Sequence, residues 1–212
     1  MKKLLLSFVL LVSIAGVSAQ DLQKSVFGIH AGTTISNINM SAEGLTVGMT
    51  SKFGFQVGAS YEALLSKRSP LYFETGVYFT QKGASMDAEG VTVKINLSQI
   101  LVPVMLNYQV NLGQGVAFVP FAGLYYSVGV GGVQSVGDAA GTSYDEADSY
   151  GVSSGNNRSE VGLRVGAGIN FDRVVLKVGY EHGFTSIIKK IDSSVEASAK
   201  SSAFTVTLGY RF

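Results

Sequence analysis

The chain has 212 residues and a net charge of +1, and only 15% of its residues are charged. This length suits one domain or one small barrel, and the charge provides no basic surface for nucleic acid. The sequence contains no cysteine, which excludes disulfides and thiolate metal sites. Its aromatic content, 12 Phe and 10 Tyr, is high for a chain with so few charges.

The N-terminus is typical of an export signal. Two lysines precede an apolar run at 4–17, and small residues at 17–19 precede a cleavage point. The run is shorter than the roughly 20 residues that a membrane-spanning helix needs. We therefore expect a signal peptide at 1–19 and a mature domain at 20–212, and no cysteine follows the signal that could carry a lipid anchor.

Eight segments of the mature chain alternate apolar residues with small or polar ones. Such alternation indicates strands, because successive side chains point to opposite faces of a sheet. No apolar segment after residue 20 is long enough for a spanning helix, although the mean hydropathy is positive, so the apolar surface must lie in these strands. They are predicted at 26–35, 52–63, 71–80, a run ending near 108, 116–130, 160–171, 174–181 and 202–212.

The connections between these strands alternate long and short. Polar segments at 36–51, 83–90, 131–157 and 185–201 alternate with short turns near Lys67, at 111–115 and at 172–173. Outer-membrane barrels show this alternation, with long loops outside and tight turns at the periplasm. Because a bilayer offers unpaired backbone groups no partner, the sheet must close. The sequence predicts an all-β fold: an eight-stranded antiparallel up-and-down transmembrane β-barrel with four long extracellular loops, short periplasmic turns and both termini periplasmic.

Aromatic residues fall at both ends of the predicted strands, as expected for rings seated at two membrane interfaces. The turn-side ends carry Tyr61, Phe73, Tyr108, Phe118, Phe171, Tyr210 and Phe212, and the loop-side ends carry Phe53, Phe55, Phe79, Tyr126, Phe184 and Phe204.

Nearly every charged residue of the strands lies on the face opposite the apolar one. Eight strands enclose a space that side chains just fill, and charges held there are costly unless they are paired. A filled structural core is therefore favoured over a gated conduit. The predicted interior ion-pair network consists of Glu62, Glu74, Glu160, Arg164, Lys177, Glu181 and Arg211.

Two irregularities are expected within the strands. Pro103 and Pro120 lack the N–H that a sheet ladder needs, so one local defect around 111–115 holds both, or the register differs there. The alternation slips near Ser98 and Gln99, which predicts a bulge.

Residues with catalytic or metal-binding chemistry are sparse, and we predict no catalytic, cofactor or metal site. His30 faces inward and His182 lies near the outer end of its strand, and neither has a metal-ligating partner two or four residues away. The acidic third loop is either a solvated segment or a site for a divalent cation, which favours clustered carboxylates. Its acids are Asp138, Asp145, Glu146 and Asp148.

The C-terminal strand resembles the closing strand of bacterial outer-membrane barrels, a signal for the barrel-assembly machinery. Its apolar face is formed by Phe204, Val206, Leu208, Tyr210 and Phe212. Four features carry a wider resemblance: the export junction at 17–20 and the segments at 101–104, 121–123 and 210–212. Through them, residues 22 to 212 resemble the small outer-membrane β-barrel (porin-like, PorT-type) family of Bacteroidota, which is similar in size to the OmpA and OmpX barrels. The resemblance implies a fold and a location rather than a reaction.

The leading functional hypothesis is a non-enzymatic outer-membrane protein whose mobile surface loops serve envelope integrity, adhesion or binding. The alternatives are a narrow channel for small solutes, a barrel enzyme with a histidine at the loop-side rim, and a soluble lipocalin-like barrel. The expected partners are outer-membrane lipid and lipopolysaccharide, the barrel-assembly machinery and an unidentified surface ligand.

Overall fold

The computed structural model describes residues 24–42, 45–48, 50–88, 91–138, 143–150, 157–187 and 197–212. The predicted signal peptide, 1–19, lies outside this part of the chain. The strands within it are β1 (Ser25–Ala42), β2 (Leu45–Gly48), β3 (Thr50–Ser66), β4 (Ser69–Ala88), β5 (Val91–Tyr108), β6 (Val110–Gly113), β7 (Val116–Gly131), β8 (Val133–Asp138), β9 (Ser143–Asp148), β10 (Ser159–Phe171), β11 (Val174–Gly183) and β12 (Ala197–Arg211). Among the described residues, no helix is long and apolar enough to cross a membrane.

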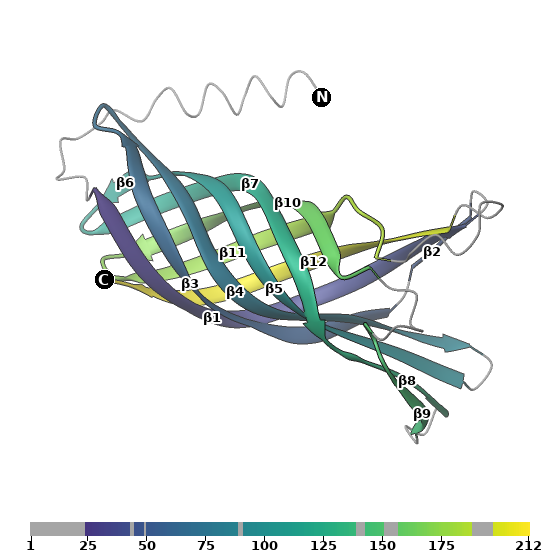
Figure 1. Ribbon diagram of the computed structural model, residues 1–212. Helices are drawn as coiled ribbons and strands as arrows, with labels where there is room; N and C mark the ends of the chain where they lie inside the picture. Colours follow the sequence, from purple (N-terminus) through teal and green to yellow (C-terminus); the bar gives the residue numbers. More distant parts are fainter. Residues whose placement is uncertain are drawn as a thin grey trace.

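Eight of these strands close into a barrel (Figure 1). In ring order they are β1, β3, β4, β5, β7, β10, β11 and β12, and each is antiparallel to its neighbours. The seam is the pairing of β1 with β12, which runs from Gly28 opposite Arg211 to Ala42 opposite Ala197. The predicted eight-stranded antiparallel up-and-down barrel is confirmed.

The two faces of the strands differ as the alternation predicts. On β12, Val206 is 44% exposed and faces outward, whereas its neighbour Thr205 is 1% exposed and faces the interior. The large apolar side chains Phe55 and Leu208 are likewise exposed on the outward face. Ring pairs lie toward both ends of the barrel, with Phe27–Tyr61 and Tyr210–Phe212 at the turn end and Phe55–Phe79 and Tyr180–Phe204 toward the other.

The strands continue well into segments that the sequence analysis predicts as polar loops, so that prediction was partly wrong. The β4–β5 ladder extends to Ala88 opposite Val91, and β8 pairs with the outer part of β5. In Figure 1 the β8–β9 hairpin projects from the end of the barrel opposite the C-terminus. Strands already aligned by the barrel extend their backbone ladder without needing an apolar face.

The short turns have the backbone that their sequences favour. Gly113 and Gly115 adopt φ angles of 92° and 78°, a region that glycine enters without steric cost. Asp172, in the two-residue turn between Phe171 and Val174, has φ 52°. Aspartate is among the residues that tolerate this left-handed conformation.

The register shift predicted near Ser98 and Gln99 is present between β5 and β7. Ser98 pairs with Gly131 and Gln99 with Gly129, so the extra residue is Val130 on β7. Alternation along β5 itself continues unbroken from Leu97 to Asn107. The bulge is therefore real, but it belongs to the partner strand.

The two strand prolines occupy separate gaps rather than one shared defect. Pro103 lies where the β4–β5 ladder is interrupted, between Thr75 opposite Val104 and Tyr78 opposite Leu101. Pro120 lies between the segments of β7 that pair with β5 and with β6. Each proline therefore lies where the ladder with one neighbouring strand is already interrupted, so its lack of an N–H costs no ladder hydrogen bond there.

Inward glycines accommodate aromatic rings as well as the charged side chains. A Cβ at Gly162 would lie 2.5 Å from ring atoms of Tyr125, and one at Gly58 would lie 2.5 Å from the ring of Tyr78. A Cβ at Gly166 would overlap the ring of Phe121 in the same way, and the same ring lies in van der Waals contact with the Cβ position of Gly179. The glycines thus let large rings lie flat against the barrel wall and fill its interior.

Candidate functional site: the barrel interior

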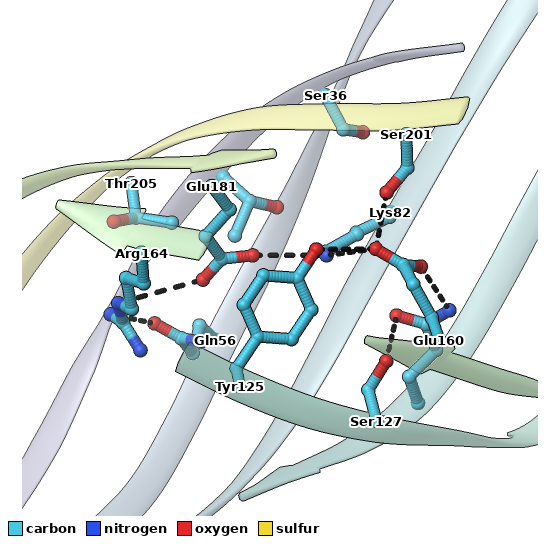
Figure 2. Close-up of polar contacts among 12 residues, drawn as sticks. Ser36, Gln56, Lys82, Tyr125, Ser127, Glu160, Arg164, Glu181, Ser201 and Thr205 are labelled. Carbon is cyan, nitrogen blue, oxygen red and sulfur yellow. Dashed lines mark hydrogen bonds and ion pairs between the residues drawn. The ribbon is translucent and has the colours of Figure 1, made fainter. Parts of the chain in front are cut away.

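The loop-side half of the interior holds a four-charge cluster centred on Lys82 (Figure 2). Lys82 Nζ lies 2.9 Å from Glu181 Oε2 and 3.6 Å from Glu160 Oε1. Arg164 Nε lies 3.6 Å from Glu181 Oε1. The outer cluster, as we name these four residues, therefore joins β4, β10 and β11 across the barrel.

Neutral side chains form hydrogen bonds with two members of the outer cluster, Glu160 and Arg164. Glu160 accepts hydrogen bonds from the Tyr125 hydroxyl, from Ser201 Oγ at 2.5 Å and from Gln99 Nε2 at 3.3 Å. Arg164 Nη2 donates to Gln56 Oε1 at 3.2 Å. Figure 2 shows the Tyr125 ring between these groups, and Lys82 Nζ lies 4.8 Å from the centre of that ring.

A second four-charge cluster fills the turn-side half of the interior. Lys177 Nζ lies 2.7 Å from Glu74 Oε2 and 3.8 Å from Glu62 Oε1. Arg211 Nη2 lies 3.0 Å from Glu62 Oε2, and Asn107 Nδ2 donates to Glu74. We call Lys177, Arg211, Glu62 and Glu74 the inner cluster.

Each cluster pairs two cations with two carboxylates and is formally neutral. All eight side chains except Arg211, which is partly exposed, are buried. Buried ions are strongly destabilising when unpaired, so this balance allows the interior to remain charged without a compensating ion. All seven residues predicted for the network lie inside the barrel, three of them in the outer cluster and four in the inner one.

Lys82 is the one member that the sequence analysis missed. The alternation predicts a third strand that ends at residue 80, two residues before Lys82. β4 continues to Ala88, and the alternation that places Glu74, Tyr78 and Thr80 inward also places Lys82 inward. Continuing the even-numbered pattern by one step would have found it.

An apolar cluster lies next to the outer cluster at the loop-side end of the barrel. Its buried members are Ile38, Ala84, Leu97, Tyr150, Ile187 and Ala199. The Tyr150 hydroxyl accepts a hydrogen bond from Gln99 Nε2 at 3.4 Å, so this layer is in direct contact with the polar groups around Glu160. The apolar layer therefore covers the charged interior at this end.

The two histidines lie on opposite faces of the wall. His30 Nε2 lies 2.8 Å from Ser60 Oγ in the interior. His182 faces outward with Tyr180 and Phe184, its ring 6.5 and 6.0 Å from theirs. Glu181, beside it in sequence, faces inward, so among the described residues this acid does not join His182 in a site at the rim.

The acidic third loop falls on the β8–β9 hairpin. Asp148 Oδ1 accepts a hydrogen bond from the Tyr150 N–H at 2.9 Å. The side chains of Asp138, Asp145 and Glu146 lie outside the described residues. Within the part of the chain that is described, no group of three or more histidine or acidic side chains is placed to hold a metal ion.

The predicted C-terminal signal forms the outward face of β12. Phe204, Leu208 and Phe212 are 58%, 59% and 64% exposed, and Val206 and Tyr210 share their face. Both edges of β12 are paired, one with β11 and the other with β1. β12 therefore closes the barrel while its apolar side chains remain on the outer surface.

Several solved structures are similar to this chain. A comparison with curated proteins found no match. Among solved structures, Neisserial surface protein A (NspA) is 17% identical, with 88% of this chain and 97% of that chain covered and a TM-score of 0.47. OprG from Pseudomonas aeruginosa is 12% identical, with 92% and 99% covered and a TM-score of 0.47. Ail, the attachment invasion locus protein of Yersinia pestis, is 15% identical, with 90% and 100% covered and a TM-score of 0.44.

The family assignment rests on a match to a family model, which does not depend on these structures. A family model described as "Outer membrane protein beta-barrel domain" matches residues 18–189, which is most of the chain. The closed barrel and its apolar outer face fit a protein of the outer membrane. The chain belongs to the outer membrane protein beta-barrel domain family.

Proposed function

We propose that this chain is a non-enzymatic integral outer-membrane protein with an occluded interior, which presents its protruding strands to the exterior for adhesion, binding or envelope integrity. The single observation that carries the proposal is the filled interior. Two neutral ion-pair clusters lie one above the other, with an apolar layer over the outer one. A barrel of eight strands has little further space, so free diffusion of solutes does not fit it.

The protruding strands support a role in binding. β8 and β9 extend the β4–β5 hairpin beyond the barrel, and among the described residues β9 pairs only with β8. An edge strand exposes unpaired N–H and C=O groups, to which a partner can add a strand of its own.

The proposed orientation places the short turns and both termini at the periplasm. Phe212 N–H donates to Phe27 O at 2.8 Å, so the C-terminus lies beside the start of β1 at the turn end. In bacterial barrels the short turns are periplasmic and the longer connections are extracellular. We further propose that the export signal at 1–19 is removed, and that the apolar face of β12 is recognised by the barrel-assembly machinery.

The occluded interior is tested by conductance in planar bilayers. Refolded wild-type protein is expected to give no steady current above the lipid baseline. A steady, reproducible open level would instead support the narrow-channel alternative and contradict occlusion.

The display role is tested on cells with a deletion of residues 133–148, which removes the β8–β9 hairpin and leaves the eight barrel strands complete. The deletion is expected to abolish binding of the cells to host matrix or to immobilised envelope material while outer-membrane levels stay unchanged. The matched control is shortening the turn at 111–115, at the other end of the barrel. Equal loss in both variants, or no loss with the hairpin deleted, would contradict the display role.

The enzyme alternative finds little support in the position of His182. The imidazole lies on the outward face among aromatic rings rather than in a cleft with an acid. The PorT-type assignment stays a prediction from the segments at 101–104, 121–123 and 210–212, and contact with lipopolysaccharide remains part of the proposal.

A further inference from the structure

The outward face of the barrel has a groove of about 750 Å³ at the seam where β1 meets β12, and it extends onto β3 and β11. Ala31 and Ala59 supply small side chains there, between the larger Ile29, Val57 and Leu208. Its lining is almost wholly apolar. Its volume lies within the roughly 300–1,000 Å³ of typical ligand pockets.

A cation lies at the turn end of this groove. Val174 and Tyr210 line the groove, and the exposed Arg173 adjoins Val174 in sequence. Arg173 Nη1 donates to the Tyr210 hydroxyl at 3.4 Å, and its carbonyl oxygen accepts from the Arg211 N–H at 2.7 Å. The side-chain contact places the guanidinium beside Tyr210, and the backbone contact ties the turn to β12. The guanidinium therefore lies at the level of the Tyr210–Phe212 ring pair, where lipid headgroups begin.

We propose that this groove binds one glycerophospholipid, with an acyl chain along Ala31 and Ala59 and the phosphate on Arg173. Hydrocarbon suits the apolar lining, and a guanidinium matches the geometry of a phosphate. A second copy of the chain is a poorer fit, because among the outward positions of the barrel strands whose side chains are described there is no carboxylate to pair with Arg173. Placing this lipid in the periplasmic leaflet depends on the orientation proposed above. The groove and its cation are observed independently of that orientation.

Native mass spectrometry of the full barrel in mild detergent tests the site. The protein is titrated with phosphatidylglycerol and with the diacylglycerol of the same chains, which lacks the phosphate. Wild type is expected to retain phosphatidylglycerol about tenfold better, the factor that one charge-assisted hydrogen bond supplies. Arg173→Gln should remove this preference but keep the weaker binding of diacylglycerol. Filling the groove with Ala31→Leu and Ala59→Leu together should abolish retention of both lipids.

Matched controls come from the same chain. Ala122 is also a small outward side chain, on β7, and Arg68 is another exposed cation in a short turn. Ala122→Leu and Arg68→Gln should each bind both lipids as wild type does. All variants change the outer surface only, and heat-modifiable migration on a gel verifies that each barrel is folded.

Three results would overturn the proposal. The first is unchanged lipid retention when the groove is filled. The second is an equal loss of the preference for phosphatidylglycerol with Arg68→Gln, because general surface charge would then explain the preference. The third is a protein dimer in wild type that the Ala31→Leu, Ala59→Leu variant loses, which makes the groove an interface between copies. None of these readouts depends on conductance or on cell binding, so the site and the proposed function fail independently.

Discussion

Lys82 is the residue on which the outer cluster depends. Lys82→Met leaves Glu160 and Glu181 buried with fewer positive partners, and breaking a buried ion pair in this way costs about 3–5 kcal/mol. We expect the free energy of unfolding to fall by that amount, as measured by urea titration of the protein in lipid vesicles. Lys94→Met is the control, because Lys94 is exposed on β5, and surface substitutions usually change stability by less than about 0.5 kcal/mol. Equal effects of the two substitutions would rule out a structural role for the cluster.

The interior charges show how far reasoning at the level of single residues extends. A charge opposite an apolar face must point inward, so seven members of the network could be predicted from alternation alone. Which carboxylate meets which cation could not, because Lys177 and Glu74 are far apart in sequence and meet only across the closed barrel. Their pairing depends on strand tilt and register, which one strand's pattern does not contain.

The strand ends mark the limit of prediction at the level of elements. Inside the membrane the two faces of a strand meet different surroundings, and the difference produces the period-two pattern. Beyond it the two faces no longer meet such different surroundings, so the pattern weakens although the β4–β5 ladder continues to Ala88 opposite Val91. The sequence therefore predicts the barrel well and its protruding strands poorly.

Hydrogen exchange tests this continuation of the ladder. Residues 83–88 and 91–96 are paired between β4 and β5. Peptides that cover them should exchange at least roughly tenfold more slowly than the exposed turn at Gln114 and Gly115, since paired amides exchange only through local opening. The measurement is mass spectrometry of peptides after timed labelling in detergent. Exchange as fast as in the turn would mean that these residues form an irregular loop in solution.

The whole molecule combines a lipid-facing surface with an interior that holds two formally neutral ion-pair clusters, the outer and the inner one. Every described strand of the barrel contributes to both, because its outward side chains form the surface and its inward ones fill the lumen. Whether water and ions reach that lumen separates an occluded protein from a conduit. Buried pairs are screened by salt much less than exposed ones, so stability can report on access.

Raising NaCl from about 0.1 M to about 1 M shortens the Debye length from about 10 Å to about 3 Å. The free energy of unfolding in vesicles is compared at the two salt concentrations for wild type and for the double variant Lys82→Met, Glu181→Gln. If the interior is occluded, the change with salt should be no larger in wild type than in this variant. That variant lacks the closest ion pair of the outer cluster and reports the effect of salt on lipid and denaturant alone. A loss of stability confined to wild type would mean that salt screens the pair in the folded state. The ions would then reach the outer cluster either past the apolar layer of Ile38, Leu97 and Tyr150 or from the turn end past Arg211, and a conduit would describe the barrel better than a filled core.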